Sequence, residues 1–426
     1  MSPQRTVADQ LTATLGVVLG TPDVPLRLRG WDGSQAGPVG APVLDVRSPQ
    51  ALRRLLWSPG QLGLGRAYVA GEIDVEGDVF ATFAALSSAG RLAGTGPMAA
   101  PTPRERLRLL GLALRLGAVG PEPAPPAEEA DLGRGLRHSR RRDAAAIAHH
   151  YDVGNDFYEL VLGPSMVYSC AVWASPETGL DAAQEAKLDL VCRKLGLTED
   201  SSLLDVGCGW GSLAIHAAQR YGATVVGITL SGEQARRAAK RVAEAGLTDR
   251  VDIRVQDYRT VDDGPFDAIS SIGMAEHVGR AHLPEYAARL RDLLRPGGRL
   301  LNHAIAWNAG TKTWDPDTFI ARYVFPDGEL VGLGEMVGVL ESPDLEVLDV
   351  ESLRRHYALT LRAWVQRLEE NWEGAVAVAG EGRARVWRLY MAACALAFEA
   401  GHMGVAQVLL QRTGGEQPPL RRTDWT

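Results

Sequence analysis

The chain has 426 residues, of which 46% are hydrophobic and 23% charged, and its formal net charge is −7. This composition excludes a mainly disordered protein, and the length exceeds what one hydrophobic core commonly supports, so we expect two domains. The negative net charge disfavours a general nucleic-acid-binding protein, although a locally basic face can still meet anionic lipid.

The sequence also argues against membrane-spanning and metal-binding proteins. It contains no run of about 18 uncharged apolar residues, and residues 1–10 lack the apolar core of a signal peptide, so we expect a cytoplasmic protein. Its cysteines show no CxxC spacing, which argues against a zinc site and a disulfide framework. They are Cys170, Cys192, Cys208 and Cys394. We therefore expect reduced thiols and no metal, and we interpret Cys192 and Cys394 as structural because they lie in helical patterns.

The amino-terminal region precedes a proline-rich segment. Residues from about 41 to 95 contain short apolar runs broken by glycine and indicate a small mixed domain. Residues 121–130 are too rich in proline for a helix and predict a linker. We therefore divide the chain into an amino-terminal domain (1–96), a basic helix and linker (97–143) and a second domain (144–426).

Two basic segments flank this linker. In residues 103–116 arginines interleave with leucines, which predicts a basic amphipathic helix, and residues 134–142 form a cationic run. Two interpretations stay open: the helix packs between domains, or the basic segments bind anionic lipid headgroups. The second would place the protein peripherally on the inner face of the membrane.

From about residue 201, strands and helices alternate in the manner of a doubly wound α/β domain. The apolar runs predict strands at 202–206, 223–228, 251–255, 266–272, 299–305 and 345–350. The amphipathic segments predict helices at 212–221, 232–245, 282–294, 359–372 and 383–410. The fold class expected is therefore α/β, a Rossmann-like domain with a smaller amino-terminal mixed domain.

A glycine-rich turn marks a nucleotide site. The sequence GCGWG (207–211) directly follows a strand that ends in Asp205 and Val206, and it opens a helix. Gly207 and Gly209 let the backbone turn sharply and approach a ligand, and the helix N–H groups can receive polar groups of a nucleotide.

The surroundings of this turn favour S-adenosylmethionine over a dinucleotide. The spacing is GxGxG instead of GxGxxG, and the second strand ends without the acidic residue that binds an NAD ribose. Neutral hydrogen-bonding groups stand there instead, namely Thr229, Ser231 and Gln234. Gln256 and Asp257, at the end of the third strand, are placed to receive adenine, whose amine would donate to the carboxylate.

The motifs together resemble the cyclopropane-fatty-acyl-phospholipid synthase family of S-adenosylmethionine-dependent methyltransferases, which includes mid-chain fatty acid methyltransferases. The resemblance rests on HYDVGNDFY (150–158), YSCA (168–171), DVGCGWG (205–211), GITLSGEQ (227–234) and MAEHVG (274–279). It covers roughly residues 145 to 400. Residues 55–86 also resemble the amino-terminal domain of the phospholipid-acting members, which implies that residues 1–96 form a lipid-associated domain.

The resemblance implies two ligands. The residues implied to contact S-adenosylmethionine are Tyr151, Tyr168, Ser169, Gly207, Gly209, Thr229, Leu230, Gln234 and Asp257. The residues implied to hold a bicarbonate ion are Cys170, Glu276, His303, the backbone of Ile305, and Tyr357. The implied activity is methylation of a double bond in an unsaturated phospholipid acyl chain, which forms a cyclopropane ring, and the implied assembly is a homodimer.

This chemistry accounts for the residue types. Attack by an alkene leaves a carbocation, which a dry pocket with aromatic faces stabilises, and Trp307, Trp314, Phe319 and Tyr323 are candidates for those faces. A base must then take a proton from the new methyl group, and bicarbonate is suited to that step. Bicarbonate next to Glu276 would be repelled unless that carboxyl is protonated or His303 balances the charge.

Three other functions stay open. A hydride shift before proton loss would give a methylene branch, which a partner reductase could convert to a methyl branch. An amine methyltransferase of small molecules would share YSCA-like motifs. A non-catalytic lipid-binding protein would fail to bind the adenosyl ligand.

Overall fold

The computed structural model describes residues 5–58, 60–87, 89, 102–130, 142, 154–308, 318–341, 344–415, 417–418 and 420–422. Packing divides the chain into two compact units. The first unit combines Met1–Glu129 with two later segments, Asp317–Tyr323 and Gly380–Leu396. The second unit holds the remainder. This grouping differs from the division expected at residues 96 and 143. The first unit extends to Glu129 and includes two segments that come much later in the sequence.

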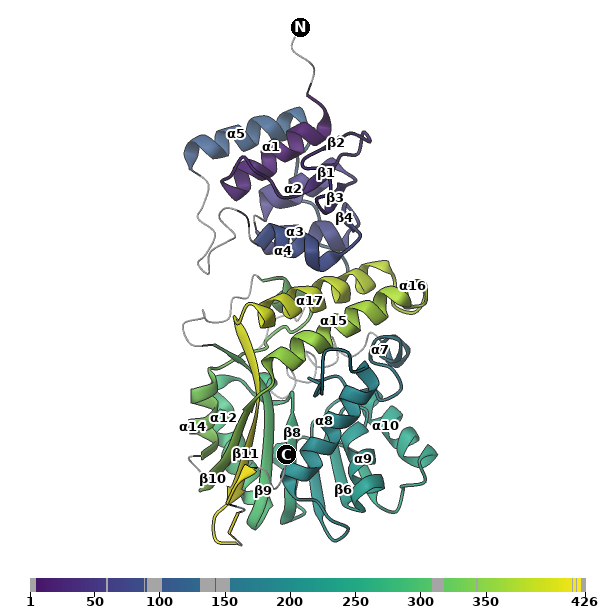
Figure 1. Ribbon diagram of the computed structural model, residues 1–426, viewed down its shortest axis with the longest axis vertical. Coiled ribbons are helices and arrows are strands. Elements are labelled where there is room, and N and C mark those ends of the chain that lie inside the picture. The colour runs from purple at the N-terminus through teal and green to yellow at the C-terminus, as the bar shows by residue number, and fades with distance from the viewer. Residues whose placement is uncertain are drawn as a thin grey trace. The chain divides into compact units, whose positions relative to one another are not determined.

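The first unit contains a small four-stranded sheet surrounded by helices, with strand order β2-β1-β3-β4 (Figure 1). Its elements are α1 (Val7–Leu19), β1 (Arg27–Arg29), β2 (Gln35–Ala36), β3 (Val43–Val46), α2 (Pro49–Trp57), α3 (Gln61–Val69), β4 (Ile73–Glu76), α4 (Val79–Ser87), α5 (Pro103–Arg115), α13 (Phe319–Tyr323) and most of α17 (Glu381–Glu399). The helix expected at residues 103–116 is therefore present as α5.

Buried polar contacts explain why late segments join the first unit. Arg385 of α17 is 4% exposed, and its guanidinium donates to the Asp74 carboxylate at 2.9 Å. Arg66 donates to Glu129 at 2.7 Å, and the Tyr323 hydroxyl donates to the same carboxylate at 3.1 Å. Such contacts between residues distant in sequence leave no local pattern, so a sequence scan could not anticipate them.

The second unit is built on a seven-stranded sheet with the order β10-β11-β9-β8-β5-β6-β7. Strands β9, β8, β5, β6 and β7 are parallel, whereas β11 is antiparallel to both its neighbours. The strands are β5 (Ser202–Val206), β6 (Thr224–Thr229), β7 (Val251–Val255), β8 (Phe266–Ile272), β9 (Leu294–Trp307), β10 (Leu345–Ser352) and β11 (Met403–Arg412). The expected Rossmann-like α/β fold is confirmed.

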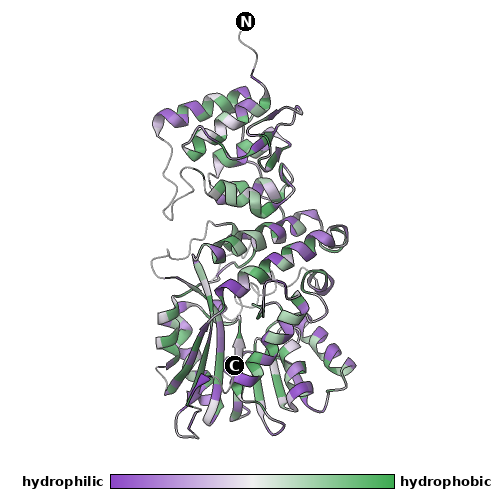
Figure 2. Cartoon of the chain, viewed as in Figure 1, coloured by the Kyte–Doolittle hydropathy of each residue, from purple (hydrophilic) through white to green (hydrophobic). Residues whose placement is uncertain are grey.

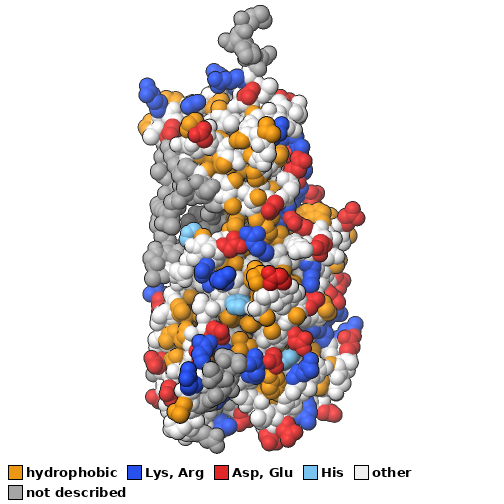
Figure 3. Space-filling view, viewed as in Figure 1, with side chains coloured by type: hydrophobic (Ala, Val, Ile, Leu, Met, Phe, Trp, Pro, Cys, Tyr) orange, Lys and Arg blue, Asp and Glu red, His pale blue; other side chains and the backbone are white. Residues whose placement is uncertain are grey.

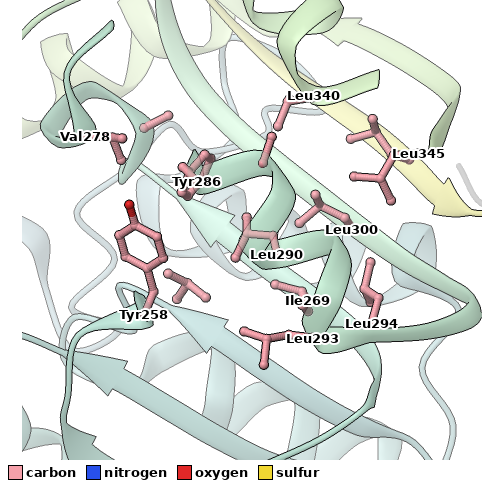
Figure 4. Close-up of a cluster of buried hydrophobic side chains, with 14 of the residues drawn as sticks. Tyr258, Ile269, Val278, Tyr286, Leu290, Leu293, Leu294, Leu300, Leu340 and Leu345 are labelled. Carbon is pink, nitrogen blue, oxygen red and sulfur yellow. The ribbon is translucent and has the colours of Figure 1, made fainter. Parts of the chain in front are cut away.

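Helices cover both faces of this sheet. The helices of the second unit are α7 (Asn155–Leu162), α8 (Leu180–Leu195), α9 (Ser212–Tyr221), α10 (Gly232–Glu244), α11 (Ala275–Val278), α12 (Leu283–Leu293), α14 (Leu333–Glu341), α15 (Arg354–Glu370) and α16 (Trp372–Ala379). Figure 1 shows α12 and α14 on one face and α8, α9 and α10 on the other. Consecutive strand residues alternate between two cores: Leu300 belongs to the cluster under α12 and α14 (Figure 4), and Leu301 to the cluster under α8 and α9.

One expected helix is wrong in its second half. Residues 383–410 were expected to be a single helix, but the helix ends at Glu399 and residues 403–410 belong to strand β11. This strand is buried on both faces and is therefore mostly apolar, so that green predominates over purple along it in Figure 2. Such a run cannot be distinguished from a buried helix by periodicity. Gly401, with φ of +75°, makes the turn that separates the two elements.

The described part of the chain holds neither a membrane-spanning helix nor a cluster of metal-binding side chains. No described helix combines the length and the apolarity that crossing a bilayer requires. No group of three or more His, Cys, Asp or Glu side chains in the described ranges is arranged to hold a metal ion.

Candidate active site

A pocket opens at the carboxyl ends of β5, β6 and β8, where an open α/β sheet commonly binds its ligand. Among the residues predicted to contact the cofactor, those that line it are Tyr168, Ser169, Asp205, Gly207, Gly209, Thr229, Leu230, Gln234, Gln256 and Asp257. Tyr151 lies outside the described residues. Ser231 is the one described member of the predicted set that does not line the pocket.

The glycine-rich turn gives the pocket its backbone wall. Gly207 and Gly209 have φ values of +81° and +56°, in the left-handed region that favours glycine. The N–H groups of Gly207 and Cys208 both donate to the carbonyl of Ile228 at 2.9 Å, which fixes the turn against β6. The backbone therefore reaches the pocket without an intervening side chain at either glycine.

A closed hydrogen-bond set forms the wall after β6. The Thr229 hydroxyl donates to Gln234 Oε1 at 2.9 Å and accepts from the backbone N–H of Ser231 at 3.2 Å. Ser231 accepts from the Gln234 N–H at 3.2 Å and so caps α10. Ser231 thus has a structural position, whereas the amide nitrogen of Gln234 has no described hydrogen-bond acceptor and is available to a ligand.

Asp257 has a partner that the sequence interpretation missed. Its Oδ1 accepts from Arg259 Nε at 2.9 Å, and its Oδ2 accepts from Nη2 of the same guanidinium at 2.6 Å. Arg259 also lines the pocket. An adenine amine must therefore share a carboxylate oxygen that is already bound to Arg259, instead of meeting an unpaired carboxylate. The separation of only two residues within one turn is the signal that could have indicated this pair.

The floor of the pocket carries two buried charges. Asp205 is 3% exposed and accepts from the Ser270 hydroxyl at 2.7 Å, and burial raises the pKa of its carboxyl to about 6. Lys187 of α8 also lines the pocket, and burial lowers the pKa of its ammonium to about 8. No described residue accepts a hydrogen bond from Lys187. Lys187 was also missed, although it occupies a buried position in the pattern of Ala183, Gln184, Leu188 and Val191 on α8.

Glu276 lies on α11, the short helix that follows β8. Its Oε1 accepts from the backbone N–H of Ile305 at 2.7 Å, while Oε2 is buried and has no hydrogen-bond donor among the described residues. Burial raises the pKa of this carboxyl to about 7. Met274, His277 and Val278, on the same segment, line the pocket. Glu276 is therefore an incompletely bonded acid next to the cofactor pocket.

His303 on β9 has the same incomplete bonding. Its side chain is 2% exposed, its Nδ1 is 3.3 Å from the Gln407 amide nitrogen of β11, and its Nε2 has no described hydrogen-bond partner. Burial, and then the charges of Lys187 and Lys194, lower the pKa of His303 to about 3. Without a bound anion the imidazole is therefore neutral near pH 7, whereas the sequence interpretation had allowed it to carry a positive charge.

Cys170 and Tyr357 meet through the backbone of Leu353. The Leu353 carbonyl accepts from the Cys170 thiol at 3.7 Å and from the Tyr357 N–H at 3.0 Å. The Leu353 N–H donates to Val405, whose register partner is Ile305, the residue that donates to Glu276. One series of backbone contacts thus links four of the five predicted bicarbonate residues, namely Cys170, Tyr357, Ile305 and Glu276. Burial raises the pKa of the Cys170 thiol well above its ordinary value, so the thiol is a donor and not a nucleophilic thiolate.

The aromatic candidates do not form one group. Phe319 and Tyr323 stack on each other at 4.7 Å within the first unit, and Trp314 lies outside the described residues. Trp307 is the candidate that β9 carries, and its buried Nε1 makes no described hydrogen bond. Tyr168, which was predicted as a cofactor contact, lines the pocket and stacks at 5.3 Å on Trp364, a ring that the prediction missed.

Comparison with known proteins places these features in a family. The model of the mycolic acid cyclopropane synthetase family matches residues 138–408. The probable fatty acid methyltransferase Rv3720 of Mycobacterium tuberculosis is 43% identical in an alignment of 424 residues that covers 96% of this chain and 96% of that one. The cyclopropane-fatty-acyl-phospholipid synthase of Escherichia coli is 37% identical over 276 residues, 64% of this chain and 69% of that one.

A solved structure agrees with these matches. The mycolic acid cyclopropane synthase CmaA1, complexed with SAH and CTAB, superposes with a TM-score of 0.59 at 32% identity. The superposition covers 63% of this chain and 98% of CmaA1. The similarity to CmaA1 is therefore confined to part of the chain, whereas the similarity to Rv3720 extends over nearly all of it.

Proposed function

Because this chain belongs to the mycolic acid cyclopropane synthetase family, we propose that it methylates a double bond of an unsaturated phospholipid acyl chain to form a cyclopropane ring. The chain is an S-adenosylmethionine-dependent C-methyltransferase. The observation that carries the proposal is the acid site, where Glu276 Oε2 and His303 Nε2 are both buried without described hydrogen-bond partners. A site of this kind fits a small polar ligand held next to the cofactor pocket.

The pocket residues fit S-adenosylmethionine. The unpaired Gln234 amide nitrogen and the side-chain-free turn at Gly207 and Gly209 would bind its polar groups, and Asp257 with Arg259 would meet its adenine. When bound, S-adenosylmethionine supplies an electrophilic methyl group. The role of the protein is to hold that group close to the double bond and to keep water away, since an isolated alkene is a weak nucleophile.

The acid site fits bicarbonate. Its donors and acceptors would be the Cys170 thiol, the Glu276 carboxyl, the His303 imidazole, the Ile305 backbone and the Tyr357 hydroxyl. When bound, bicarbonate supplies a base for the proton that leaves the new methyl group. Loss of that proton frees the electron pair of the C–H bond, which closes the three-membered ring onto the cationic acyl carbon.

The charges of the site support this fit. His303 is neutral, so the positive charge must come from another residue, and we assign that role to Lys187, whose charge acts on both Cys170 and His303. Glu276, with a pKa of about 7, can hold the proton that removes repulsion between its carboxyl and an anion. The same proton would let Glu276 donate a hydrogen bond to bicarbonate.

A methylene branch is the second candidate product. It is favoured by the relative matched over 96% of this chain, which is named as a fatty acid methyltransferase and not as a cyclopropane synthase. A hydride shift before proton loss would give this product, and a partner reductase would then be needed for a methyl branch. We further propose a homodimer that works at the inner face of the membrane.

The test is to incubate the purified protein with S-adenosylmethionine and oleoyl-phospholipid liposomes. The released fatty esters are then analysed by mass spectrometry before and after mild hydrogenation, with a reaction lacking S-adenosylmethionine as the control. A methylated ester that resists hydrogenation supports the cyclopropane product, and one that takes up hydrogen supports the methylene branch. The absence of any modified ester, when the protein binds S-adenosylhomocysteine normally, would contradict both.

A further inference from the structure

Helix α5 of the first unit has two apolar faces, of which only one is used in packing. Leu112, Ala113 and Leu116 are 4% to 7% exposed and form the packed face. Leu107, Leu110 and Leu114 are 72%, 48% and 62% exposed. At 3.6 residues per turn the exposed leucines fall within roughly 60° of one another, on the side opposite the packed face.

The exposed leucines are not the result of a poorly formed helix. The Thr102 hydroxyl accepts from the Glu105 N–H at 3.3 Å, and the Glu105 carboxylate accepts from the Thr102 N–H at 2.7 Å, which is a complete capping box. Pro103 occupies the first turn, where proline favours a helix. The helix is therefore well started, and its second apolar stripe is a stable surface feature.

Arginines border the leucine stripe on both sides. Arg104, Arg108 and Arg115 lie between the stripe and the packed face along one side, and Arg106 lies along the other. All four arginines are exposed to solvent. In Figure 3 blue basic side chains lie next to orange hydrophobic ones over α5. An apolar stripe bordered by arginines matches the chemistry of an anionic bilayer surface, which offers acyl chains below a layer of negative headgroups.

The end of α2, which is hydrogen-bonded to the segment that follows α5, carries a further exposed apolar side chain. Trp57 is 53% exposed, and its indole N–H donates to the carbonyl of Gly120 at 3.1 Å. Gly120 follows Val119, which is 46% exposed. Tryptophan with one wet and one apolar side suits the interfacial region of a bilayer.

A second copy of the chain fits the stripe less well than a membrane does. In a two-fold symmetric contact the stripe would meet itself, and the bordering arginines would face identical arginines across the interface. Interface cores are depleted of charge, and three leucines provide only a small part of the roughly 1,000 Å² that a specific interface buries.

We propose that α5 binds anionic phospholipid bilayers, with its leucine stripe at the acyl boundary and its arginines at the headgroups. This inference deepens the proposed function, on which it rests for the identity of the acyl substrate. Membrane contact through α5 would hold the enzyme at the surface that contains that substrate.

The experiment measures co-sedimentation of the full-length protein with phosphatidylcholine vesicles, with and without phosphatidylglycerol. One variant carries L107S, L110S and L114S, and another carries R104Q, R108Q and R115Q. The matched controls remove the same number of exposed groups elsewhere: V39S, V350S and V378S for the leucines, and R220Q, R236Q and K240Q for the arginines. Thermal unfolding verifies that each variant folds.

Wild type and both controls are expected to bind the anionic vesicles. Each arginine near an anionic surface increases vesicle affinity by about fivefold, so loss of three arginines should weaken binding roughly 100-fold. The leucine variant should lose affinity to a comparable extent. Equal binding by wild type and either α5 variant would overturn the proposal. So would a leucine variant that changes from dimer to monomer in light scattering while it still binds vesicles, because the stripe would then join two copies.

Activity on detergent-dispersed phospholipid separates this inference from the proposed function. If the α5 variants lose vesicle binding but methylate dispersed lipid as wild type does, both proposals stand. If wild type modifies no lipid while vesicle binding still depends on α5, the proposed function fails and the inference on α5 is supported.

Discussion

The two halves of the active site differ in how their polar groups are satisfied. On the cofactor side, Thr229 is bonded to Gln234, and Asp257 to Arg259, before any ligand arrives. On the acid side, Glu276 and His303 each have a buried polar atom with no described hydrogen-bond partner. The comparison teaches that the cofactor side is held in shape by its own contacts, whereas the acid side keeps two buried polar atoms without a described partner, where a ligand could bind.

The largest expected effect comes from the acid side. Replacing Glu276 by Gln keeps the shape but removes the titratable proton, and we expect kcat to fall by about 100-fold or more. Binding of S-adenosylhomocysteine, measured by calorimetry, should be unchanged because the cofactor side is bonded independently. Glu285→Gln, an exposed substitution on α12, is the control. Full activity with unchanged bicarbonate dependence in Glu276→Gln would contradict the difference between the two halves.

The same carboxyl predicts a pH dependence of stability. Its pKa is raised from 4.5 to about 7 in the folded protein, so between these values the folded state keeps a proton that the unfolded state has lost. This contribution stabilises the fold at low pH and is lost as pH rises through about 7, and its upper limit is about 3 kcal/mol. Glu276→Gln lacks the contribution. The free energy of unfolding in urea should therefore rise for the variant relative to wild type between about pH 5 and about pH 8. If the difference in free energy between the two proteins stayed constant over this range, the Glu276 carboxyl would not titrate there.

A smaller effect on activity is expected from Lys187, the buried cation that lines the pocket. Lys187→Met should raise the bicarbonate concentration needed for half-maximal activity by roughly tenfold, because one buried charge next to an anion contributes on the order of 1–3 kcal/mol. Lys240→Met, on the exposed surface of α10, should leave it unchanged. If instead the affinity for S-adenosylhomocysteine alone decreased, Lys187 would belong to the cofactor side.

The smallest effect tests the preformed bonding of the cofactor side. Thr229→Val removes the hydroxyl between Gln234 and Ser231, and we expect S-adenosylhomocysteine to bind several-fold more weakly, by about 1 kcal/mol. At saturating cofactor kcat should match that of wild type. A large loss of kcat would mean that the two halves are coupled. Thr224→Val, at the opposite end of β6, is the matched substitution.

Ten of the predicted cofactor residues line one pocket because the segments that carry them are local. The turn at 207–211 and the segments around Thr229 and Asp257 each lie at the end of one strand, so chain order alone places them at one edge of the sheet. The bonding between them was not predictable in detail: Ser231 caps a helix instead of lining the pocket, and Arg259 occupies the Asp257 carboxylate.

The acid side could be named by family resemblance but not assembled from the sequence. Its residues meet through Leu353 and Val405, which carry no chemical signal, and through strand β11, which was expected to be a helix. Lys187 was overlooked because a single lysine in a helix is usually exposed, and only its place in the buried pattern of α8 distinguishes it. Contacts between residues distant in sequence determine both the assembly of the acid side and the burial of Lys187. The periodicity of apolar residues does not reveal such contacts.

The order in which the chain is synthesised means that α17 and β11, which lie near its carboxyl end, determine when the two units can fold. Arg385 completes the first unit, and β11 inserts between β9 and β10 to complete the large sheet. Neither unit can reach its native packing until the ribosome has made nearly the whole polypeptide. We therefore expect nascent chains stalled before residue 380 to be sensitive to protease throughout, unlike a protein whose first domain folds while the second is still being translated.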